Sequence, residues 1–129
     1  MATKSFTELI VWQKAHDFVL AVYRMSARFP REELYGLTAQ FRRAVVSIPA
    51  NIAEGYSKSG VNEKLRFFNI AESSLEECKY FLILAEDLHY AAQGNLFEKA
   101  EEVGMLLSGY IKKLKETKHQ LADRSKNEG

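Results

Sequence analysis

Apolar residues recur every three or four positions along most of this chain, which is the spacing of one face of an α-helix. The first stripe consists of Val11, Ala15, Phe18, Val22, Met25 and Phe29. Other apolar residues beside it widen the stripe beyond a simple two-helix seam. The residue before a proline is pushed out of the helical region, so this helix is expected to end at Phe29 and Pro30.

A second stripe contains a proline and is followed by a glycine. It consists of Leu37, Phe41, Ala44, Ile48 and Ile52. Pro49 removes one backbone hydrogen bond and clashes with the carbonyl group of Val45. Because the apolar pattern continues through Ile52, the sequence predicts a helix bent near residues 45–49 and not broken there. Gly55 is the expected C-terminal stop.

Two further stripes predict a third and a fourth helix. The third is expected to start near Asn62 and to end near residues 93–95, and Asn95 is a reasonable N-cap for the fourth. The C-terminal residues 124–129 are expected to fray. The third stripe consists of Leu65, Phe68, Ala71, Leu75, Cys78, Leu82 and Ala85, and the fourth of Ala100, Val103, Leu107, Tyr110 or Ile111, and Leu114, with Leu121 as a candidate last member.

These patterns predict an all-α fold, an antiparallel up-down-up-down four-helix bundle. Residues 1–129 form one domain in this interpretation, with an ordered core over about residues 8–119. No segment alternates in the way that a strand requires. Several aromatic residues are left over once one core is filled, and such residues often mark a self-association surface. A homo-oligomer is therefore expected. The surplus aromatic residues are Tyr23, Tyr35, Tyr56, Phe67, Tyr80 and Tyr90.

Composition narrows the class of protein. The chain has 129 residues and a hydrophobic fraction of 47%, which is ordinary for a globular protein and enough for a core without disulfides. One cysteine, Cys78, excludes an intrachain disulfide and fits a reducing compartment. The N-terminal apolar stretch is too short and too interrupted for a signal peptide, and no run could span a membrane. A cytoplasmic location with no membrane partner is expected.

Charge is unevenly distributed although the net charge is only +1. Residues 72–102 hold eight acidic and two basic residues, whereas residues 112–126 hold six basic and two acidic ones. Solvated helix faces are one explanation. The alternative is a surface that attracts a polyanion or a complementary protein face.

Candidate catalytic chemistry is sparse. Glu86 and His89 have the Glu-x-x-His spacing of a di-iron bundle, but the motif occurs once where two copies are needed. Cys78 lies on an apolar stripe, as a buried small hydrophobic residue would. No phosphate-binding or dinucleotide-binding loop is present. The expectation is a protein that is not an enzyme and needs no cofactor or metal.

Basic residues are the strongest remaining candidates for a site, because Arg and Lys can hold backbone phosphates. For Arg43, the alternative is an ion pair within the chain, with an acid such as Glu54 or Glu77. The polar residues Gln40, Ser47 and Asn51 are expected to form hydrogen bonds between helices. The proposed nucleic-acid-binding residues are Arg28, Arg31, Arg42, Arg43, Lys58, Lys64, Lys112 and Lys113, with further lysines after them.

Three segments, VWQKA (11–15), FPREELYGLTAQFRRAVVSIPANIAEG (29–55) and IAESSLEE (70–77), resemble the bacterial four-helix-bundle proteins that are encoded by intervening sequences in 23S rRNA genes. The likeness covers roughly residues 8–115. It implies a four-helix bundle that assembles as a pentamer. One departure is Ser73, where the family usually has glycine. The resemblance supplies no catalytic residues, and it leaves open a structural role for the motif residues Arg42, Arg43, Ser47, Asn51, Glu54 and Gly55.

This family is distantly similar to the accessory variability proteins of diversity-generating retroelements, which have a basic surface and bind a reverse transcriptase. The resemblance therefore implies RNA, or an enzyme that acts on nucleic acid, as a partner. The leading hypothesis is a protein that binds structured ribosomal RNA as a homo-oligomer. The alternative is an assembly or accessory subunit that contacts another protein and not RNA, through its aromatic surface and the acidic segment 72–102.

Overall fold

A computed structural model describes residues 5–128 of the chain, with side chains described through residue 126. Four α-helices make up most of it, and no strand occurs in the described part. This confirms the prediction of an all-α fold with four helices. The helices are α1 (Ile10–Ser26), α2 (Leu37–Ser57), α3 (Val61–Asp87) and α4 (Leu96–Glu128), with short 3-10 turns η1 (Phe6–Glu8) and η2 (Arg31–Glu33).

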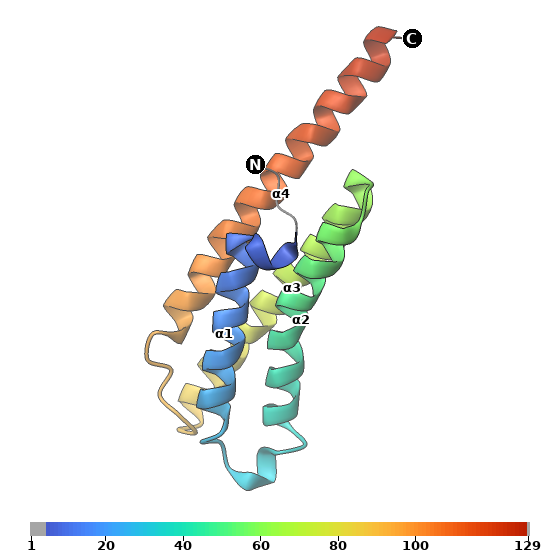
Figure 1. Ribbon diagram of the computed structural model, residues 1–129. Helices are drawn as coiled ribbons and strands as arrows, with labels where there is room; N and C mark the ends of the chain where they lie inside the picture. The colour runs from blue at the N-terminus through green and yellow to red at the C-terminus, as the bar shows by residue number, and fades with distance from the viewer. Residues whose placement is uncertain (1–4, 129) are drawn as a thin grey trace.

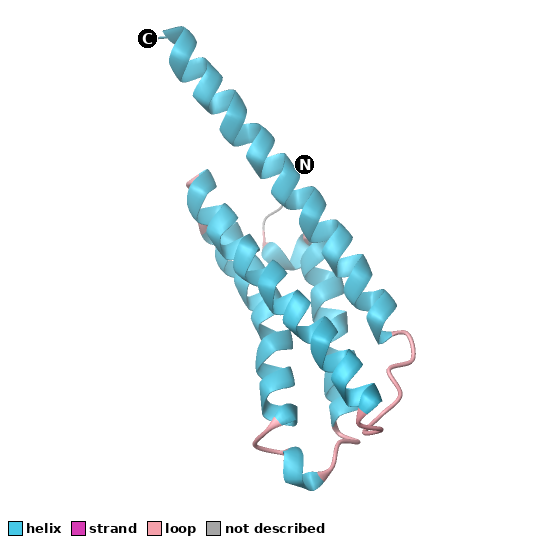
Figure 2. Cartoon of the chain, turned by 180° about the vertical axis from the view of Figure 1, so that it is seen from behind, coloured by secondary structure: helices cyan, strands magenta, loops and turns pink. Residues whose placement is uncertain are grey.

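The chain runs down through α1, back up through α2, down through α3 and up again through α4 (Figure 1). Each helix packs against two others, since α1 contacts α2 and α4, and α3 contacts the same two helices from the other side. Seen from behind, the helices are joined by short loops (Figure 2). None of the helices in the described range is long and apolar enough to cross a membrane.

Aromatic residues from all parts of the chain meet in the core. Phe41 is fully buried, and its ring lies 6.3 Å from that of Phe29 and 5.6 Å from that of Phe81. Near the other end of the bundle, buried Phe68 packs 5.2 Å from the half-buried ring of Tyr110. The residues of the first three predicted stripes are buried in this core, and so are Ala100, Val103, Leu107 and Ile111 of the fourth, because burying apolar surface is the main force that holds amphipathic helices together. Leu114 is only half-buried and Leu121 is exposed.

Helix α2 differs from the prediction at its C-terminus. Pro49 lies inside the helix and is buried, and the helix continues beyond it to Ser57. Gly55 is therefore not the stop. A β-carbon at this position would lie 3.1 Å from Phe68 Cε2 and 3.2 Å from Phe67 Cβ, so the glycine allows α3 to approach closely. The sequence prediction of a Gly55 cap was wrong because a close helix contact also favours glycine.

Helix α3 ends earlier than predicted, at Asp87. His89 follows with a φ of 60°, in the left-handed region that often terminates helices. The side-chain cap of α4 comes from Gln93, whose Oε1 accepts a hydrogen bond of 3.1 Å from the backbone N–H of Phe97. Asn95, the predicted N-cap, provides no such side-chain bond.

Helix α4 extends past the end of the bundle (Figure 1). We call residues 112–126 the α4 arm. Leu114 is half-buried, and the other side chains of the arm are exposed. Residues 124–128, which the sequence predicts to fray, continue the helix here.

Candidate nucleic-acid interface

The eight predicted phosphate-binding residues lie at opposite ends of the molecule. One group lies near the turn between α1 and α2, and the other lies near the turn between α2 and α3 and on the nearby part of α4 (Figure 1). The first group is Arg28, Arg31, Arg42 and Arg43, and the second is Lys58, Lys64, Lys112 and Lys113. The structure therefore does not bring all eight into one patch.

Arg42 is held by the bundle. Its Nε donates a hydrogen bond of 2.8 Å to Ser26 Oγ, and its Nη2 donates one of 3.4 Å to the carbonyl oxygen of Tyr23. The guanidinium also stacks over the Tyr23 ring, 4.6 Å from its centroid. Ser26 is buried. Because Ser26 and Tyr23 belong to α1, the Arg42 side chain connects α2 to the end of α1. Two of the three nitrogen atoms of Arg42 are thus engaged within the molecule.

The other arginines of this end are more accessible. Arg28, Arg31 and Arg43 are exposed. Arg31 and Arg42 line a small pocket of about 250 Å³ beside Pro30. The alternative expectation of an ion pair between Arg43 and Glu54 or Glu77 was wrong, since no ion pair involves Arg43 in the described part of the chain, and Glu54 lies 4.0 Å from Lys58.

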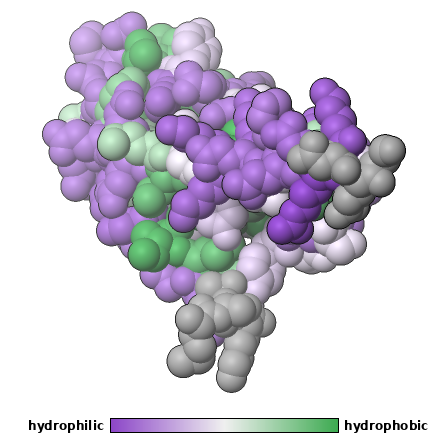
Figure 3. Space-filling model, turned by 90° about the horizontal axis from the view of Figure 1, so that it is seen from above, coloured by the Kyte–Doolittle hydropathy of each residue, from purple (hydrophilic) through white to green (hydrophobic). Residues whose placement is uncertain are grey.

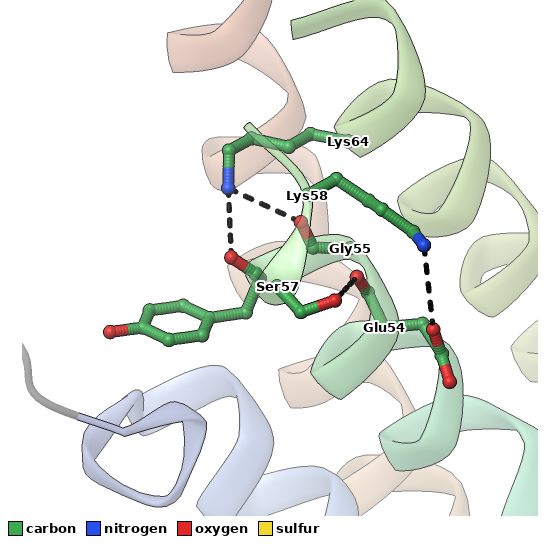
Figure 4. Close-up of polar contacts among 6 residues, drawn as sticks. Glu54, Gly55, Ser57, Lys58 and Lys64 are labelled. Atoms are coloured by element: carbon green, nitrogen blue, oxygen red, sulfur yellow. Dashed lines mark hydrogen bonds and ion pairs between the residues drawn. The ribbon is translucent and has the colours of Figure 1, made fainter. Parts of the chain in front are cut away.

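Lys64 closes the C-terminus of α2 (Figure 4). Its Nζ donates hydrogen bonds of 3.2 Å to the carbonyl oxygen of Gly55 and 2.9 Å to that of Tyr56. The last carbonyl groups of a helix have no partner within the helix and carry partial negative charge, so a lysine there is stabilising. Burial lowers the pKa of Lys64 from its ordinary value.

Lys58 also makes contacts within the molecule, but they are weak. Its Nζ lies 4.0 Å from Glu54 Oε2 (Figure 4), and 5.3 Å from the centroid of the Phe67 ring. The ion pair is at the outer limit of such contacts and is half exposed, so it contributes little stability. Lys58 can therefore turn toward a ligand at small cost, whereas Lys64 cannot do so without uncapping α2.

The α4 arm carries cations that have no ion-pair partner among the described residues. All six are exposed, and no ion pair involves any of them within the described residues. Figure 3 looks onto this end of the molecule and shows hydrophilic residues over most of the projecting helix. The six residues are Lys112, Lys113, Lys115, Lys118, Arg124 and Lys126.

A groove of about 600 Å³ borders the base of the arm, between α3 and α4. Lys112, Lys115 and His119 line it from α4, and Glu72 lines it from α3. Its lining carries charges of both signs, which distinguishes it from the basic outer part of the arm. The groove therefore adds no second phosphate site to the arm.

Three acids of the acidic segment 72–102 form ion pairs among the described residues, and two of these pairs connect different helices. Lys79 Nζ lies 3.2 Å from Glu76 Oε1 and 3.6 Å from Glu101 Oε1, which links α3 to α4. Lys14 Nζ lies 3.3 Å from Glu102 Oε1, which links α1 to α4. These contacts leave fewer acids free for a partner than the sequence count indicates.

One of the three predicted polar residues of α2, Ser47, forms the expected hydrogen bond between helices. Ser47 Oγ lies 2.9 Å from Ser74 Oγ on α3, and Asn51 Nδ2 donates a bond of 2.9 Å to Ser47 Oγ. Gln40 is exposed and takes no part. The bond between helices is therefore confirmed for Ser47, whereas the bonds of Asn51 stay within α2.

Sequence reasoning missed one polar contact between two loops. Tyr90 Oη donates a hydrogen bond of 2.7 Å to Glu33 Oε2, and Glu33 Oε1 accepts one of 3.2 Å from the backbone N–H of Leu37. These two bonds lower the pKa of Glu33, and the bond to the carboxylate raises the pKa of Tyr90. The contact spans 57 positions of sequence, so no local pattern could reveal it.

The residues considered for catalysis do not assemble into a reactive group. Cys78 is fully buried, as predicted, and burial raises the pKa of its thiol, so the reactive thiolate is disfavoured. No cluster of three or more potential metal ligands occurs within the described range. His89 is exposed at the end of α3.

Comparison with solved structures finds a protein of unknown function from the S23 ribosomal protein family of Bacteroides thetaiotaomicron VPI-5482. The match covers 80% of this chain and 96% of that chain, with 23% sequence identity and a TM-score of 0.73. At this identity the likeness shows a shared fold. A search of curated proteins finds no match.

The sequence pattern of the 23S rRNA-intervening sequence proteins matches residues 7–109. The matched range contains α1, α2, α3 and the first part of α4, and it ends just before the α4 arm. Because the match extends over most of the chain, the protein belongs to the 23S rRNA-intervening sequence protein family.

Proposed function

We propose that this protein is a non-enzymatic, nucleic-acid-associated protein of the cytoplasm that binds structured RNA, ribosomal RNA in the first place, as a homo-oligomer. The observation that carries the proposal is the α4 arm, where six cations are exposed and none is neutralised by an acid of the described chain. The family membership supports a role connected with ribosomal RNA.

The geometry of the arm suits a phosphate backbone. A helix rises about 1.5 Å per residue, so the arm is roughly 20 Å long and can follow several successive phosphates. Double-stranded RNA is recognised mainly by its shape, its phosphates and its 2′-hydroxyl groups, and lysines serve such contacts well. Each contact releases counterions, which makes the affinity fall with salt.

The opposite end of the molecule supplies a second, weaker set of contacts. Arg28, Arg31 and Arg43 are exposed there, and Glu32 is an exposed acid beside them. An RNA bound to the arm would reach this end only by running the length of the bundle, or through another copy of the protein. Arg42 and Lys64 are proposed to support the fold and not to contact phosphate.

The proposal includes the finer features of the fold and assembly. The bundle is antiparallel, with α2 bent near Pro49, and several copies, five in number, assemble around one axis. Exposed apolar residues support self-association, since Tyr35 is 92% exposed and Met105 is 76% exposed. Large exposed apolar side chains are common where proteins meet.

These same apolar residues favour a second candidate function, a protein-binding accessory subunit that does not contact RNA. Its partner could be an enzyme that acts on nucleic acid. The two functions differ in their dependence on the arm, because a protein partner held by apolar contacts would not respond to the arm lysines.

The experiment is an RNA-binding measurement on structured ribosomal RNA fragments, with duplex DNA as a comparison. The variant Lys115→Glu/Lys118→Glu is expected to weaken RNA binding at least about tenfold, because phosphate contacts dominate such affinities. The matched control, Arg24→Glu/Lys99→Glu, changes the net charge equally but lies outside the arm, and should change the affinity much less. Equal losses in both variants, or no RNA binding at low salt, would contradict the proposal.

A further inference from the structure

A small pocket lies beside the turn between α1 and α2, at the end of the bundle opposite the α4 arm (Figure 1). We call it the α1–α2 pocket. Its volume is about 250 Å³. Pockets for drug-sized ligands have volumes of roughly 300–1,000 Å³, so this one suits a smaller ligand or one end of a longer molecule.

Two guanidinium groups line the α1–α2 pocket. The Arg42 side chain is fixed there, since its Nε donates to Ser26 Oγ and its Nη2 donates to the carbonyl oxygen of Tyr23. Its Nη1 takes part in neither bond and remains a free donor. Arg31 lines the pocket as well, is exposed, and forms no ion pair among the described residues. The pocket therefore presents positive charge that no ion pair neutralises.

Thr38 adds an unused hydroxyl group to the pocket. This residue is only 5% exposed, and its hydroxyl makes no hydrogen bond within the described part of the chain. No fully buried side-chain oxygen of the described residues lacks a partner, so the hydroxyl is not sealed in the core and opens toward the pocket that Thr38 lines. Polar groups inside proteins nearly always have a partner, which leaves water or a ligand for this one.

The N-terminus of α2 lies at the same place, because Thr38 is the second residue of that helix. The first N–H groups of a helix have no partner within the helix and favour an anion. This helix end already holds one carboxylate, since Glu33 Oε1 accepts a bond of 3.2 Å from the backbone N–H of Leu37. Glu33 does not line the α1–α2 pocket and so does not fill it.

The apolar part of the lining decides which anion fits. Phe29, Pro30 and Leu34 line the pocket and have no side-chain donor. A phosphate group has strong acceptor oxygens on several sides, and those that faced these residues would lose their hydrogen bonds to water without replacement. A carboxylate has its two acceptor oxygens at one end. An aliphatic group attached to it can lie against the apolar residues.

We propose that the α1–α2 pocket binds a carboxylate that carries a short aliphatic group. Arg31, Arg42 and Thr38 donate to the carboxylate oxygens, and the three apolar residues contact the aliphatic group. Two sources share this chemistry, a free aliphatic acid and the C-terminus of a polypeptide that ends in an aliphatic residue. The pocket and the α4 arm lie at opposite ends of the molecule, so the proposal does not depend on RNA binding.

The test is a titration of the full chain with isovalerate, followed by the NMR signals of the backbone amides. Because the ligand has few atoms, an affinity in the millimolar range is expected. The signals of residues 30–39 should shift. Arg31→Gln should weaken binding at least about fivefold and Thr38→Val at least about twofold, since each removes a donor to the carboxylate. The matched control is Arg28→Gln, an exposed arginine that does not line the pocket, and it should bind as the unaltered protein does.

The two sources are distinguished with N-acetyl-alanyl-leucine and its C-terminal amide. If a polypeptide C-terminus is the ligand, the peptide acid should bind more tightly than isovalerate, and the amide should not bind. If a free acid is the ligand, isovalerate should bind more tightly than the peptide. Either order supports a carboxylate site.

The proposal is overturned if isovaleramide, which has the same shape without the charge, shifts the same signals equally, or if inorganic phosphate binds more tightly than isovalerate. It is also overturned if isovalerate shifts none of these signals, or if Arg31→Gln and Thr38→Val both bind it normally. Circular dichroism verifies that each variant is folded. Lys115→Glu/Lys118→Glu should bind isovalerate as the unaltered protein does, which keeps this test separate from that of the proposed function.

Discussion

Cations within the bundle and cations on the α4 arm differ in their contacts, although the sequence shows them as the same residue types. Arg42 donates to Ser26 and Tyr23, and Lys64 donates to two carbonyl groups at the end of α2. The arm cations make no comparable contact within the described chain. A basic residue is therefore informative about ligand binding only when its donors are free.

The two regions also differ in what holds them in place. The bundle is stabilised by buried apolar surface, and its polar groups are satisfied by one another. The arm has little such packing, since Leu114 alone among its described side chains is half-buried, and helical backbone hydrogen bonds are its main support. An isolated helix of this length is only marginally stable in water, so ligand binding is expected to stabilise the arm more than the bundle.

The largest expected difference concerns the core. Phe41→Ala removes a fully buried ring between Phe29 and Phe81, and should lower the free energy of unfolding by about 3–5 kcal/mol through loss of burial and creation of a cavity. The matched change on the arm, Leu121→Ala, should alter it by less than about 0.5 kcal/mol, because Leu121 is 52% exposed. Urea unfolding measures both. Similar losses would mean that the arm packs against the bundle.

The next largest effect on stability distinguishes two arginines near the turn between α1 and α2. Arg42→Ala should cost about 1–2 kcal/mol of stability, since it removes two hydrogen bonds and a cation–π contact. Arg28→Ala should change stability by less than about 0.5 kcal/mol, because Arg28 is exposed. Chemical denaturation of both variants provides the comparison. If Arg42→Ala is as stable as Arg28→Ala, the contacts with Ser26 and Tyr23 are not maintained in solution.

A smaller effect is expected at the end of α2. Lys64→Met keeps most of the aliphatic side chain but removes the two bonds to the carbonyl groups of Gly55 and Tyr56, and should cost about 1 kcal/mol. Lys113→Met, on the arm, is the control and should be neutral for stability. Thermal unfolding of the two variants distinguishes them. A neutral Lys64→Met would show that water replaces the lysine without loss.

The smallest expected effect depends on pH. The bonds from Tyr90 and Leu37 lower the pKa of Glu33 below its ordinary value of 4.5, so the folded state holds the ionised form. This contribution to stability is complete above about pH 4.5 and is lost as the pH falls through the lowered pKa. Glu33→Gln should therefore be less stable than the unaltered protein at pH 6, and the difference should shrink toward pH 3. A difference that is constant with pH would contradict the tie between Glu33 and Tyr90.

The sequence predicts the fold correctly where a helix buries one continuous apolar face. The stripe from Val11 to Phe29 and the stripe from Leu65 to Ala85 are both buried as expected. The errors arose where a distant residue intervenes. Gly55 packs against Phe67 and Phe68 of another helix, a contact that its own neighbours in sequence do not indicate.

The sequence predicts which residues of the candidate site are basic, but it does not predict which of them are held by hydrogen bonds within the bundle. The sequence identifies Arg42 and Lys64 as basic, but their partners Ser26, Gly55 and Tyr56 are brought to them by the fold. The arm could be anticipated more fully, because six cations against two acids within residues 112–126 exceed what neighbouring acids can neutralise. Local charge excess therefore predicts which cations have no ion-pair partner among the described residues better than residue type does.

The most direct test of the central claim is the dependence of RNA affinity on salt, compared between the unaltered protein and Lys115→Glu/Lys118→Glu. The logarithm of the affinity falls linearly with the logarithm of the salt concentration, with a slope of roughly 0.7–0.9 for each phosphate contact. The account predicts that the slope of the arm variant is smaller by about 1.5 or more. An unchanged slope would contradict it and would place the phosphate contacts outside the α4 arm.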